Sequence, residues 1–305
     1  MAEKKTEQQF YTRPPKLGKW EGFRIFLWNS ETNQFLGRTG ASWGKIILFY
    51  IIFYAALIGF FAALLAVFYQ TLDMKKPKWQ LDKSVIGTNP GLGFRPMPPL
   101  IDVESTLIRY KYDNRGNIQY WKEQLDDFLS IYKAKKDGNR TNVESCIQGV
   151  SPAKDKVCEL IIDASWKPCL PEYFYSFNSS KKGPCIFLKL NKIYGWIPEY
   201  YNSSSMPKNM PPDLQEHIRE LEKNYSIHGS SEMPNVLKTV WVSCEGENPG
   251  DMENIGPVIY FPQRGFGGQY FPFLNQDNYL SPLVAVSFES PTRKYNKKKT
   301  KLSYF

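Results

Sequence analysis

The sequence predicts a protein with one membrane-spanning α-helix followed by a mainly-β domain, an antiparallel β-sandwich that carries one long helix. Three observations predict this class. An uncharged apolar run covers residues 46–69, an amphipathic helical pattern covers residues 117–136, and short β-branched and aromatic runs separated by Gly, Pro and Asn follow from residue 156. Strand runs separated by turns, with few helices, favour an antiparallel sandwich over a doubly wound sheet.

The net charge of +9 lies at the two ends of the 305-residue chain. Residues 1–45 carry eight Lys and Arg against four Glu, and residues 289–305 carry six against one Glu. Between these ends, 25 basic residues face 25 acidic ones, so the central part has no continuous basic surface along which a nucleic acid could bind. The sequence therefore argues against nucleic acid as a partner.

The run from residue 46 to 69 contains 24 residues without a charge. At about 1.5 Å per residue, a helix of this length spans roughly 36 Å, which is enough to cross a bilayer once with some tilt. The 45 residues before it and its own length argue against a cleaved signal peptide. We expect this helix to anchor the chain in a membrane.

Four N-x-S/T sequons indicate the orientation of that helix. The basic residues that flank the run on both sides leave the positive-inside rule undecided. All four sequons and all five cysteines lie after the run, which favours a type II protein with an extracellular or lumenal C-terminal part. The candidate glycosylated residues are Asn139, Asn178, Asn202 and Asn224.

Composition divides the rest of the chain. Residues 1–45 are expected to form a cytoplasmic tail and juxtamembrane segment. Five prolines between residues 77 and 99 predict an extended stalk without ladder hydrogen bonds over residues 70–105. The β-sandwich is expected over residues 106–288, with a second helix near residues 213–224, and residues 289–305 are expected to form a basic tail.

Catalytic and metal-binding motifs are missing from the sequence. The two histidines, His217 and His228, have no Cys or Glu beside them at metal-ligand spacing. The chain contains no Asp-x-Asp, G-x-S-x-G or H-E-x-x-H motif, and the glycines of residues 264–268 have the wrong spacing for a phosphate loop. Asp126 and Asp127 are expected to form a solvated pair on the long helix. We therefore expect no enzyme and no cofactor or metal, and a lumenal enzyme is the least favoured alternative.

The membrane run has two different faces. Tyr50 and Tyr54 lie on one of them, and the Tyr54 hydroxyl, about 12 Å inside the run, needs an acceptor that lipid does not provide. On another face, small residues would let a second helix backbone approach closely: Ala55, Gly59, Ala62 and Ala66. Both faces favour a membrane partner over passive anchoring.

The cysteines suggest sequential bridges, which would join Cys146 to Cys158 and Cys169 to Cys185. Spacing alone leaves other pairings open. The odd count of five leaves at least one thiol unpaired, and in the sequential pairing this is Cys244.

Several motifs together resemble the β subunits of the Na+/K+-transporting ATPase and its H+/K+ relative, in the style of insect, nervana-type members. The resemblance covers about residues 20–288. The motifs are FLWN at 26–29, FLGRTGASW at 35–43, FYIIFYAAL at 49–57, PGL at 90–92, KPC at 167–169, GPCIFLKLNKIYGWIP at 183–198 and YFPFLNQDNYLSPLVAVSF at 270–288.

This resemblance implies a noncatalytic subunit with an immunoglobulin-like β-sandwich ectodomain in the plasma membrane. Such a subunit pairs with the catalytic α subunit of the pump, is needed for folding and delivery of α, and tunes its cation affinity. A small single-span regulatory subunit is a further candidate partner. The alternative function is a glycosylated cell-adhesion or junction protein that acts independently of the pump.

The resemblance also implies roles for individual residues. It supports the Cys146–Cys158 and Cys169–Cys185 bridges, and it matches Cys244 to the fifth of six family cysteines, whose sixth partner is missing from a divergent C-terminus. The expected partner-interface residues are Tyr50, Phe53, Tyr54 and Gly59 in the span, and Tyr270, Phe271, Phe273, Tyr279 and Leu280 near the C-terminus.

Overall fold

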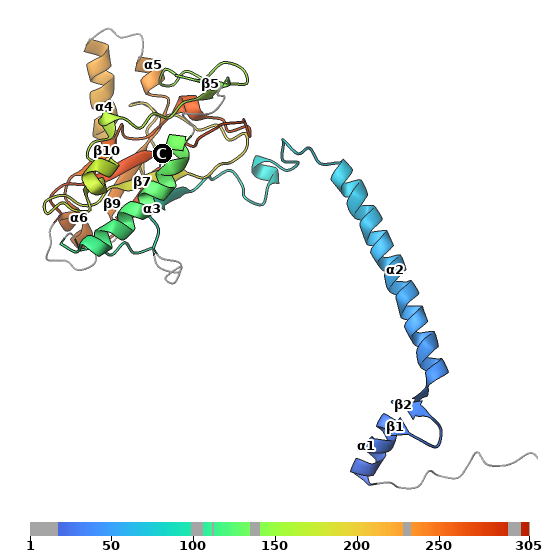
Figure 1. The fold of residues 1–305 in the computed structure, drawn as a ribbon. Coiled ribbons are helices and arrows are strands. Elements are labelled where there is room, and N and C mark those ends of the chain that lie inside the picture. Colours follow the sequence, from blue (N-terminus) through green and yellow to red (C-terminus); the bar gives the residue numbers. More distant parts are fainter. Residues whose placement is uncertain are drawn as a thin grey trace, which may run out of the picture. The chain divides into compact units, whose positions relative to one another are not determined.

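The computed structural model describes residues 18–304, apart from 99–105, 112, 135–140, 228–232 and 292–299 (Figure 1). The chain divides into two compact units, Met1–Leu72 and Asp73–Phe305. The first unit contains the apolar helix, and the second contains most of the strands.

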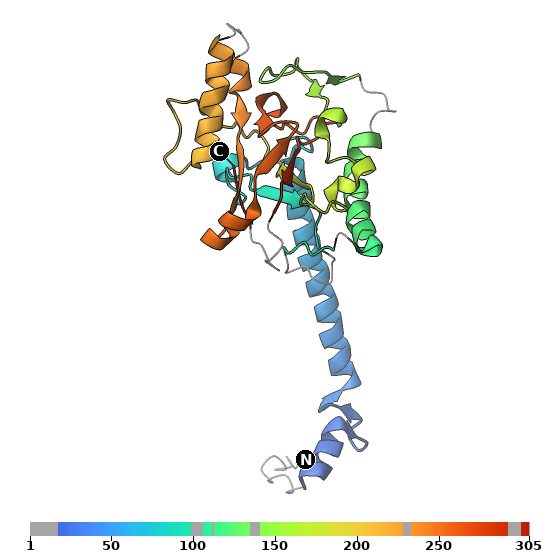
Figure 2. The same cartoon turned by 90° about the vertical axis from the view of Figure 1, so that its left-hand side faces the viewer.

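The first unit begins with a small folded element at the head of the apolar helix (Figure 2). A hydrogen bond from Trp43 Nε1 to the carbonyl oxygen of Phe35, 2.8 Å long, ties this element to the helix. Three short antiparallel strands follow a first helix in the order β1-β2-β3. The elements are α1 (Lys19–Leu27), β1 (Trp28–Asn29), β2 (Gln34–Phe35) and β3 (Arg38–Thr39).

The apolar run forms the continuous helix α2 (Gly40–Gln70). The helix begins before the expected start at residue 46 and includes the preceding GASWGK segment. Among the described residues, α2 is the one helix long and apolar enough to cross a membrane. None of its residues is buried, so its apolar surface is available to lipid or to another protein.

The centre of the second unit is a four-stranded antiparallel sheet in the order β10-β12-β7-β4. Phe187 of β7 pairs with both Ala285 and Arg95, which fixes the register of the central strands. The strands are β4 (Leu92–Arg95), β7 (Ile186–Leu190), β10 (Val258–Phe261) and β12 (Val284–Phe288).

The strand β4 corrects part of the stalk prediction. Residues 70–105 were expected to make no ladder hydrogen bonds, yet Leu92–Arg95 pairs with β7 over four residues. The proline-free stretch LGFR lies between Pro90 and Pro96, so its backbone N–H groups remain available to the ladder.

Alternating side chains bury both faces of this sheet. Phe187 and Ala285 belong to the α3-side core, which the sheet shares with α3 (Arg115–Ala134). The helix α3 lies along one side of the domain in Figure 2. Leu188 and Val284 point the other way, into a second core. This period of two is what a sheet covered on both faces requires.

Short strand pairs supply the second core. Val240, Val242 and Phe266 contribute side chains to it. The antiparallel pairs are β8 (Thr239–Val240) with β11 (Phe266–Gly267), and β9 (Val242–Gly246) with β13 (Thr300–Tyr304).

The strand β13 corrects the prediction of a basic tail over residues 289–305, because Thr300–Tyr304 pairs with β9 over five residues. The run KVCELIIDASW at residues 156–166 was also expected to contain a strand, and it contributes only the two-residue β6 (Val157–Cys158), which pairs in parallel with β5 (Val143–Glu144). The described domain is mostly β, with antiparallel sheets, as predicted.

Both predicted helices of this domain are confirmed. The long helix is α3, and Trp121, Leu125 and Leu129 on its apolar stripe are buried against the sheet. The second is α4 (Pro212–Ile227), which buries Leu214 and Ile218. The short helices α5 (Met233–Val236) and α6 (Pro249–Ile255) complete the regular elements.

Candidate partner interface

The aromatic face of α2 is fully available to a neighbour. Tyr50, Phe53 and Tyr54 are each about half exposed, at 49%, 48% and 53%. The rings of Tyr50 and Tyr54 stack with centroids 6.0 Å apart, so they form one aromatic ridge. Within the part of the chain that the structure describes, neither hydroxyl has a hydrogen-bond partner. In hydrocarbon, an unpaired hydroxyl is unfavourable, which argues for an acceptor on another chain.

The small-residue face of α2 lies about 130° around the helix from the tyrosine ridge, at about 100° per residue. An added Cβ at Gly59 would meet no described atom within 4 Å beyond the neighbouring backbone of α2 itself. The surface at Gly59 is therefore open, and a second helix could approach it closely. Two separate faces of the span are suited to helix packing.

The segment from residue 270 to 280 is mostly folded into the domain. Tyr279 is only 9% exposed, and Leu280 packs against the α3-side core. Tyr270 donates a 3.2 Å hydrogen bond to the carbonyl oxygen of Glu159, and Phe271 stands edge-on to Trp196. These four side chains therefore contribute to packing within the domain more than to a surface that a partner could contact.

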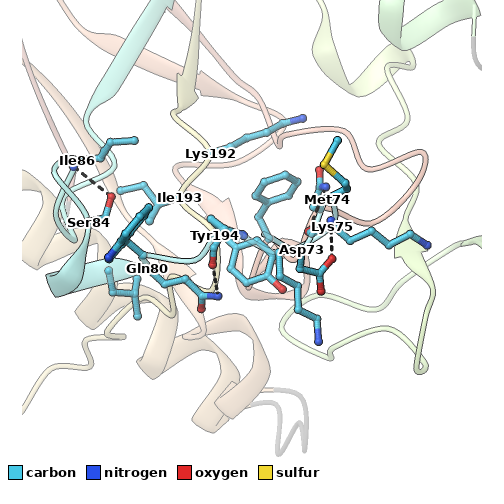
Figure 3. A pocket seen from close by; sticks show the side chains of 15 residues that line it. Asp73, Met74, Lys75, Gln80, Ser84, Ile86, Lys192, Ile193 and Tyr194 are labelled. Carbon is cyan, nitrogen blue, oxygen red and sulfur yellow. Dashed lines mark hydrogen bonds between the residues drawn. The ribbon is translucent and has the colours of Figure 1, made fainter. Parts of the chain in front are cut away.

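Phe273 differs from these four residues because it lies beside an open surface feature. Its ring is 4.9 Å from the Tyr279 ring, and the Lys192 ammonium lies 5.1 Å from the Phe273 ring centre. Phe273 also lines a cavity of about 420 Å³ (Figure 3). The segment is thus held rigidly by its buried residues while Phe273 faces the cavity.

The cavity joins the chain that follows α2 to the segment at 270–280. Figure 3 shows Asp73, Met74 and Lys75 on one side of it, Ser84 and Ile86 on the other, and Tyr194 between them. Asn275 Nδ2 donates a 3.3 Å hydrogen bond to the carbonyl oxygen of Lys75.

Sequence reasoning did not select the residues around this cavity. The available signal was the KKPKWQ segment directly after the span, in which Lys75, Lys76 and Trp79 all line the cavity. Lys192 adds a further cation, and Asp73 is the acidic lining residue. The surface is therefore basic and aromatic.

Two disulfides hold the second unit together. Cys146 is bonded to Cys158, next to the β5–β6 pair, and Cys169 is bonded to Cys185. Cys169 and Cys185 are completely buried in the α3-side core. The second bridge therefore lies among packed side chains, whereas Cys146 is partly exposed.

Cys244 is a buried free thiol in β9. Burial raises the pKa of this thiol to about 12, although the nearby Tyr260 hydroxyl and Arg264 oppose the shift. In the β9–β13 register, the residue opposite Cys244 is Leu302. A thiol with this environment is protonated and unreactive at neutral pH.

Three of the four candidate glycosylation residues lie within the described chain, and all three are exposed. Asn178 follows the η4 turn (Pro171–Ser176), Asn202 lies in a loop, and Asn224 lies on α4. Asn139 lies outside the described residues. Exposure makes these asparagines accessible to modification.

The described residues contain no group of three or more His, Cys, Asp or Glu that could hold a metal ion. His217 instead packs edge-on against Trp241, with ring centres 5.9 Å apart, and burial lowers its pKa. Asp126 is not the solvated residue that we expected, because it accepts a hydrogen bond from Tyr175. These polar groups have structural partners.

The fold defines a class of protein: a chain in which an apolar helix long enough to cross a membrane is followed by a disulfide-bonded, mostly-β domain. The profile of the family described as "Sodium / potassium ATPase beta chain" matches residues 13–301. The chain therefore belongs to the family of sodium/potassium-transporting ATPase β subunits, which are accessory and noncatalytic.

Individual relatives agree with this assignment. The chain is 50% identical over 289 residues to sodium/potassium-transporting ATPase subunit beta-2 of Drosophila melanogaster, which covers 94% of this chain and 86% of the relative. Identity to Drosophila subunit beta-1 is 38%, over 92% of this chain and 84% of the relative. Identity to subunit beta-1 of Tetronarce californica is 33%, over 89% and 85%.

Proposed function

We propose that this chain assembles with the catalytic α subunit of a Na+/K+-transporting ATPase, enables α to fold and reach the plasma membrane, and tunes its cation affinity. The observation that carries this proposal is the tyrosine ridge on α2. Tyr50 and Tyr54 are half exposed and lack hydroxyl partners among the described residues. A helix of the α subunit would provide both packing surface and acceptors.

The small-residue face at Gly59 would receive a second helix of the α subunit. Because the small-residue face lies about 130° from the tyrosine ridge, one straight helix does not cover both faces. A polytopic α subunit can supply two neighbouring helices. A small single-span regulatory subunit is a further partner that we propose from the family resemblance.

We further propose that residues 1–45 are cytoplasmic, residues 46–69 cross the membrane and the part from residue 70 onward is extracellular, with glycans on the sequons. The disulfides support an oxidising environment for the second unit. The burial of the four-stranded sheet on two faces supports an immunoglobulin-like sandwich.

The surface beside Phe273 would meet an extracellular loop of α. It lies at the cavity that also contains Lys75, and Lys75 follows the end of α2 by five residues. Five extended residues reach at most about 17 Å. An extracellular loop of α that emerges close to the membrane would therefore reach the surface beside Phe273 while membrane helices of α pack on α2.

Co-purification in mild detergent tests the assembly. We expect the wild-type chain to recover the α subunit and Tyr50→Ala/Tyr54→Ala to recover several-fold less. Tyr50→Phe/Tyr54→Phe should give an intermediate yield, because it removes only the hydroxyls. Phe60→Ala is the matched control, since Phe60 is exposed and lies about 80–120° around the helix from the two tyrosines.

Recovery of the chain without any α subunit would contradict the proposal. So would equal α yields from wild type and the tyrosine variants. Cell aggregation that the chain promotes and that survives Tyr50→Ala/Tyr54→Ala would instead favour the pump-independent adhesion function.

A further inference from the structure

A second hollow lies at the head of α2, in the first unit. Its volume is about 490 Å³. It begins at β3 and continues along the first turns of the helix. The lining residues are Arg38, Trp43, Lys45, Ile46, Phe49 and Tyr50.

The small sheet before the helix holds the polar end of this hollow in place. Arg38 pairs with Phe35 across β2 and β3. The same Phe35 accepts the Trp43 indole hydrogen bond through its carbonyl oxygen, and its ring lies 6.4 Å from that of Trp43. Arg38 and Trp43 are therefore fixed relative to each other by a folded element.

One part of the hollow is positively charged, and the other part is apolar. Arg38 and Lys45 supply two cations, and no described carboxylate lines it. Phe49 is 61% exposed and Tyr50 is 49% exposed, so their rings continue the hollow onto the open side of the helix. A ligand that complements it has a negative head and an apolar tail.

The position along the helix matches a membrane boundary. The rise from Gly40 to Ile46 is about 9 Å, and the headgroup layer on each side of a bilayer is about 5–8 Å thick. With the uncharged run in hydrocarbon, Arg38 and Lys45 lie at headgroup depth, while Phe49 lies beside the first acyl carbons. Trp43 lies in the interfacial zone that tryptophan prefers.

We propose that this hollow binds an acidic phospholipid, with its anionic headgroup between Arg38 and Lys45 and an acyl chain along Phe49. The inference goes beyond assembly with the α subunit and rests on the membrane span and the orientation proposed above. In the orientation proposed above, this end of α2 faces the leaflet in which acidic lipids are concentrated.

A helix packed on the Tyr54 side of the tyrosine ridge leaves the Lys45 flank of this site open. Phe49 lies about 40° around the helix from Lys45, whereas Tyr54 lies about 180° from Lys45. The flank formed by Lys45 and Phe49 therefore remains in contact with lipid when the Tyr54 side is covered. Tyr50 lies at the border between the two surfaces.

Photolabelling in nanodiscs tests the proposal on the full-length chain, in the complex in which it is isolated. Phosphatidylserine and phosphatidylcholine that carry the same diazirine acyl chain are compared, and labelled peptides of this chain are mapped after separation on a denaturing gel. We expect phosphatidylserine to label residues 38–50 about thirtyfold more than phosphatidylcholine, because the two cations contribute about 1 kcal/mol each and about 1.4 kcal/mol is a factor of ten.

The charge-removing variant is Arg38→Gln/Lys45→Gln, and it should lose this preference. The matched control, Lys19→Gln/Arg24→Gln, removes two cations of α1 that do not line the hollow and should keep it. Phosphatidylcholine labelling should be the same in both variants, which checks that α2 remains inserted.

Three results would overturn the proposal. Equal labelling by the two lipids would show an ordinary annulus, and equal loss in the control variant would show diffuse charge attraction. Competition by millimolar inorganic phosphate or glycerophosphoserine would show that the site binds a free anion. The same gel reports whether an α subunit is present, so a failed lipid site is distinguishable from failed assembly.

Discussion

The hydroxyl of Tyr175 donates a 2.7 Å hydrogen bond to Oδ1 of Asp126 and so joins the η4 turn to α3. Lys122 forms an ion pair with the same carboxylate. Burial alone would raise the pKa of Asp126, but the Lys122 and Tyr175 hydrogen bonds outweigh it and hold this pKa below its ordinary value. Burial and the Asp126 carboxylate both raise the pKa of Tyr175. The long helix is thus anchored by a polar contact as well as by its apolar stripe.

Tyr175→Phe should destabilise the second unit by about 1–2 kcal/mol, because it removes a hydrogen bond to a charged group and leaves its ring in place. Urea unfolding of the full-length chain in detergent, with disulfides intact, measures this loss. Tyr173→Phe is the control, since Tyr173 is 40% exposed. Equal destabilisation by both changes would contradict the role of Tyr175.

The Tyr175 contact should also depend on pH. The folded-state pKa of Asp126 is lowered, so its charged form stabilises the fold above its unfolded pKa, and this contribution is lost as pH falls through the folded pKa. The difference between wild type and Tyr175→Phe should therefore shrink below about pH 3.8, the ordinary Asp value. Urea midpoints at pH 7 and pH 3 check this, and an unchanged difference would argue against the ionised contact.

Cys169→Ser/Cys185→Ser should strongly reduce delivery to the cell surface. It opens a bridge that spans 16 residues and lies in the α3-side core, at a cost of about 3 kcal/mol. Cys146→Ser/Cys158→Ser is the matched comparison and should have a smaller effect, because Cys146 is partly exposed. Surface biotinylation measures both, and normal surface levels of the first variant would show that its bridge is dispensable.

Cys244 should resist alkylation in the native chain. Burial raises its thiol pKa to about 12, so thiolate is scarce at pH 8. N-ethylmaleimide should add one group only after denaturation, as intact mass will show. Truncation after residue 299 removes β13 and should make Cys244 reactive, whereas truncation after Tyr304 keeps the five paired residues and should not. Labelling of the native full-length chain would contradict this account.

Gly59→Leu should lower the yield of the α subunit several-fold. A Cβ added at Gly59 meets no described atom within 4 Å beyond the neighbouring backbone of α2 itself, so a loss of yield reports on a neighbouring helix. Leu65→Ile keeps side-chain volume and should have little effect. Co-purification of α measures both changes, and an unchanged yield with Gly59→Leu would mean that this face contacts lipid.

The sequence predicts the elements whose pattern is local and continuous. The uncharged run gives α2, and the apolar stripes give α3 and α4, because periodicity over ten or more residues is determined by the chain itself. The strand β7 also follows from its β-branched and aromatic run. Family membership follows from motifs distributed along most of the chain.

Elements that depend on distant partners could not be predicted in this way. The four residues of β4 become a strand only because β7 offers a free edge, and β13 pairs with β9 from the far end of the chain. At the η4 turn, Phe174 and Tyr175 have positive φ values of 50° and 48°. No local signal favours that conformation for aromatic residues, and it is held by burial of Tyr175 and its bond to Asp126.

The same difference between local patterns and contacts with distant segments applies to the candidate interface. The tyrosine ridge on α2 is visible in the sequence because residues 50 and 54 share a helix face. The burial of Tyr279 and the cavity beside Phe273 depend on segments more than 80 residues apart, such as Lys192 and the chain after the span. Motif matching therefore selected this segment without separating its buried residues from its exposed ones.

Surface delivery of the α subunit tests the central claim most directly. In cells without β subunits of their own, α at the plasma membrane is measured by surface biotinylation with the wild-type chain, with Tyr50→Ala/Tyr54→Ala, or with no added chain. We expect the wild-type chain to bring α to the surface and the tyrosine variant to deliver several-fold less. Equal surface α in all three cells would contradict the proposal that this chain is the assembling subunit of a pump.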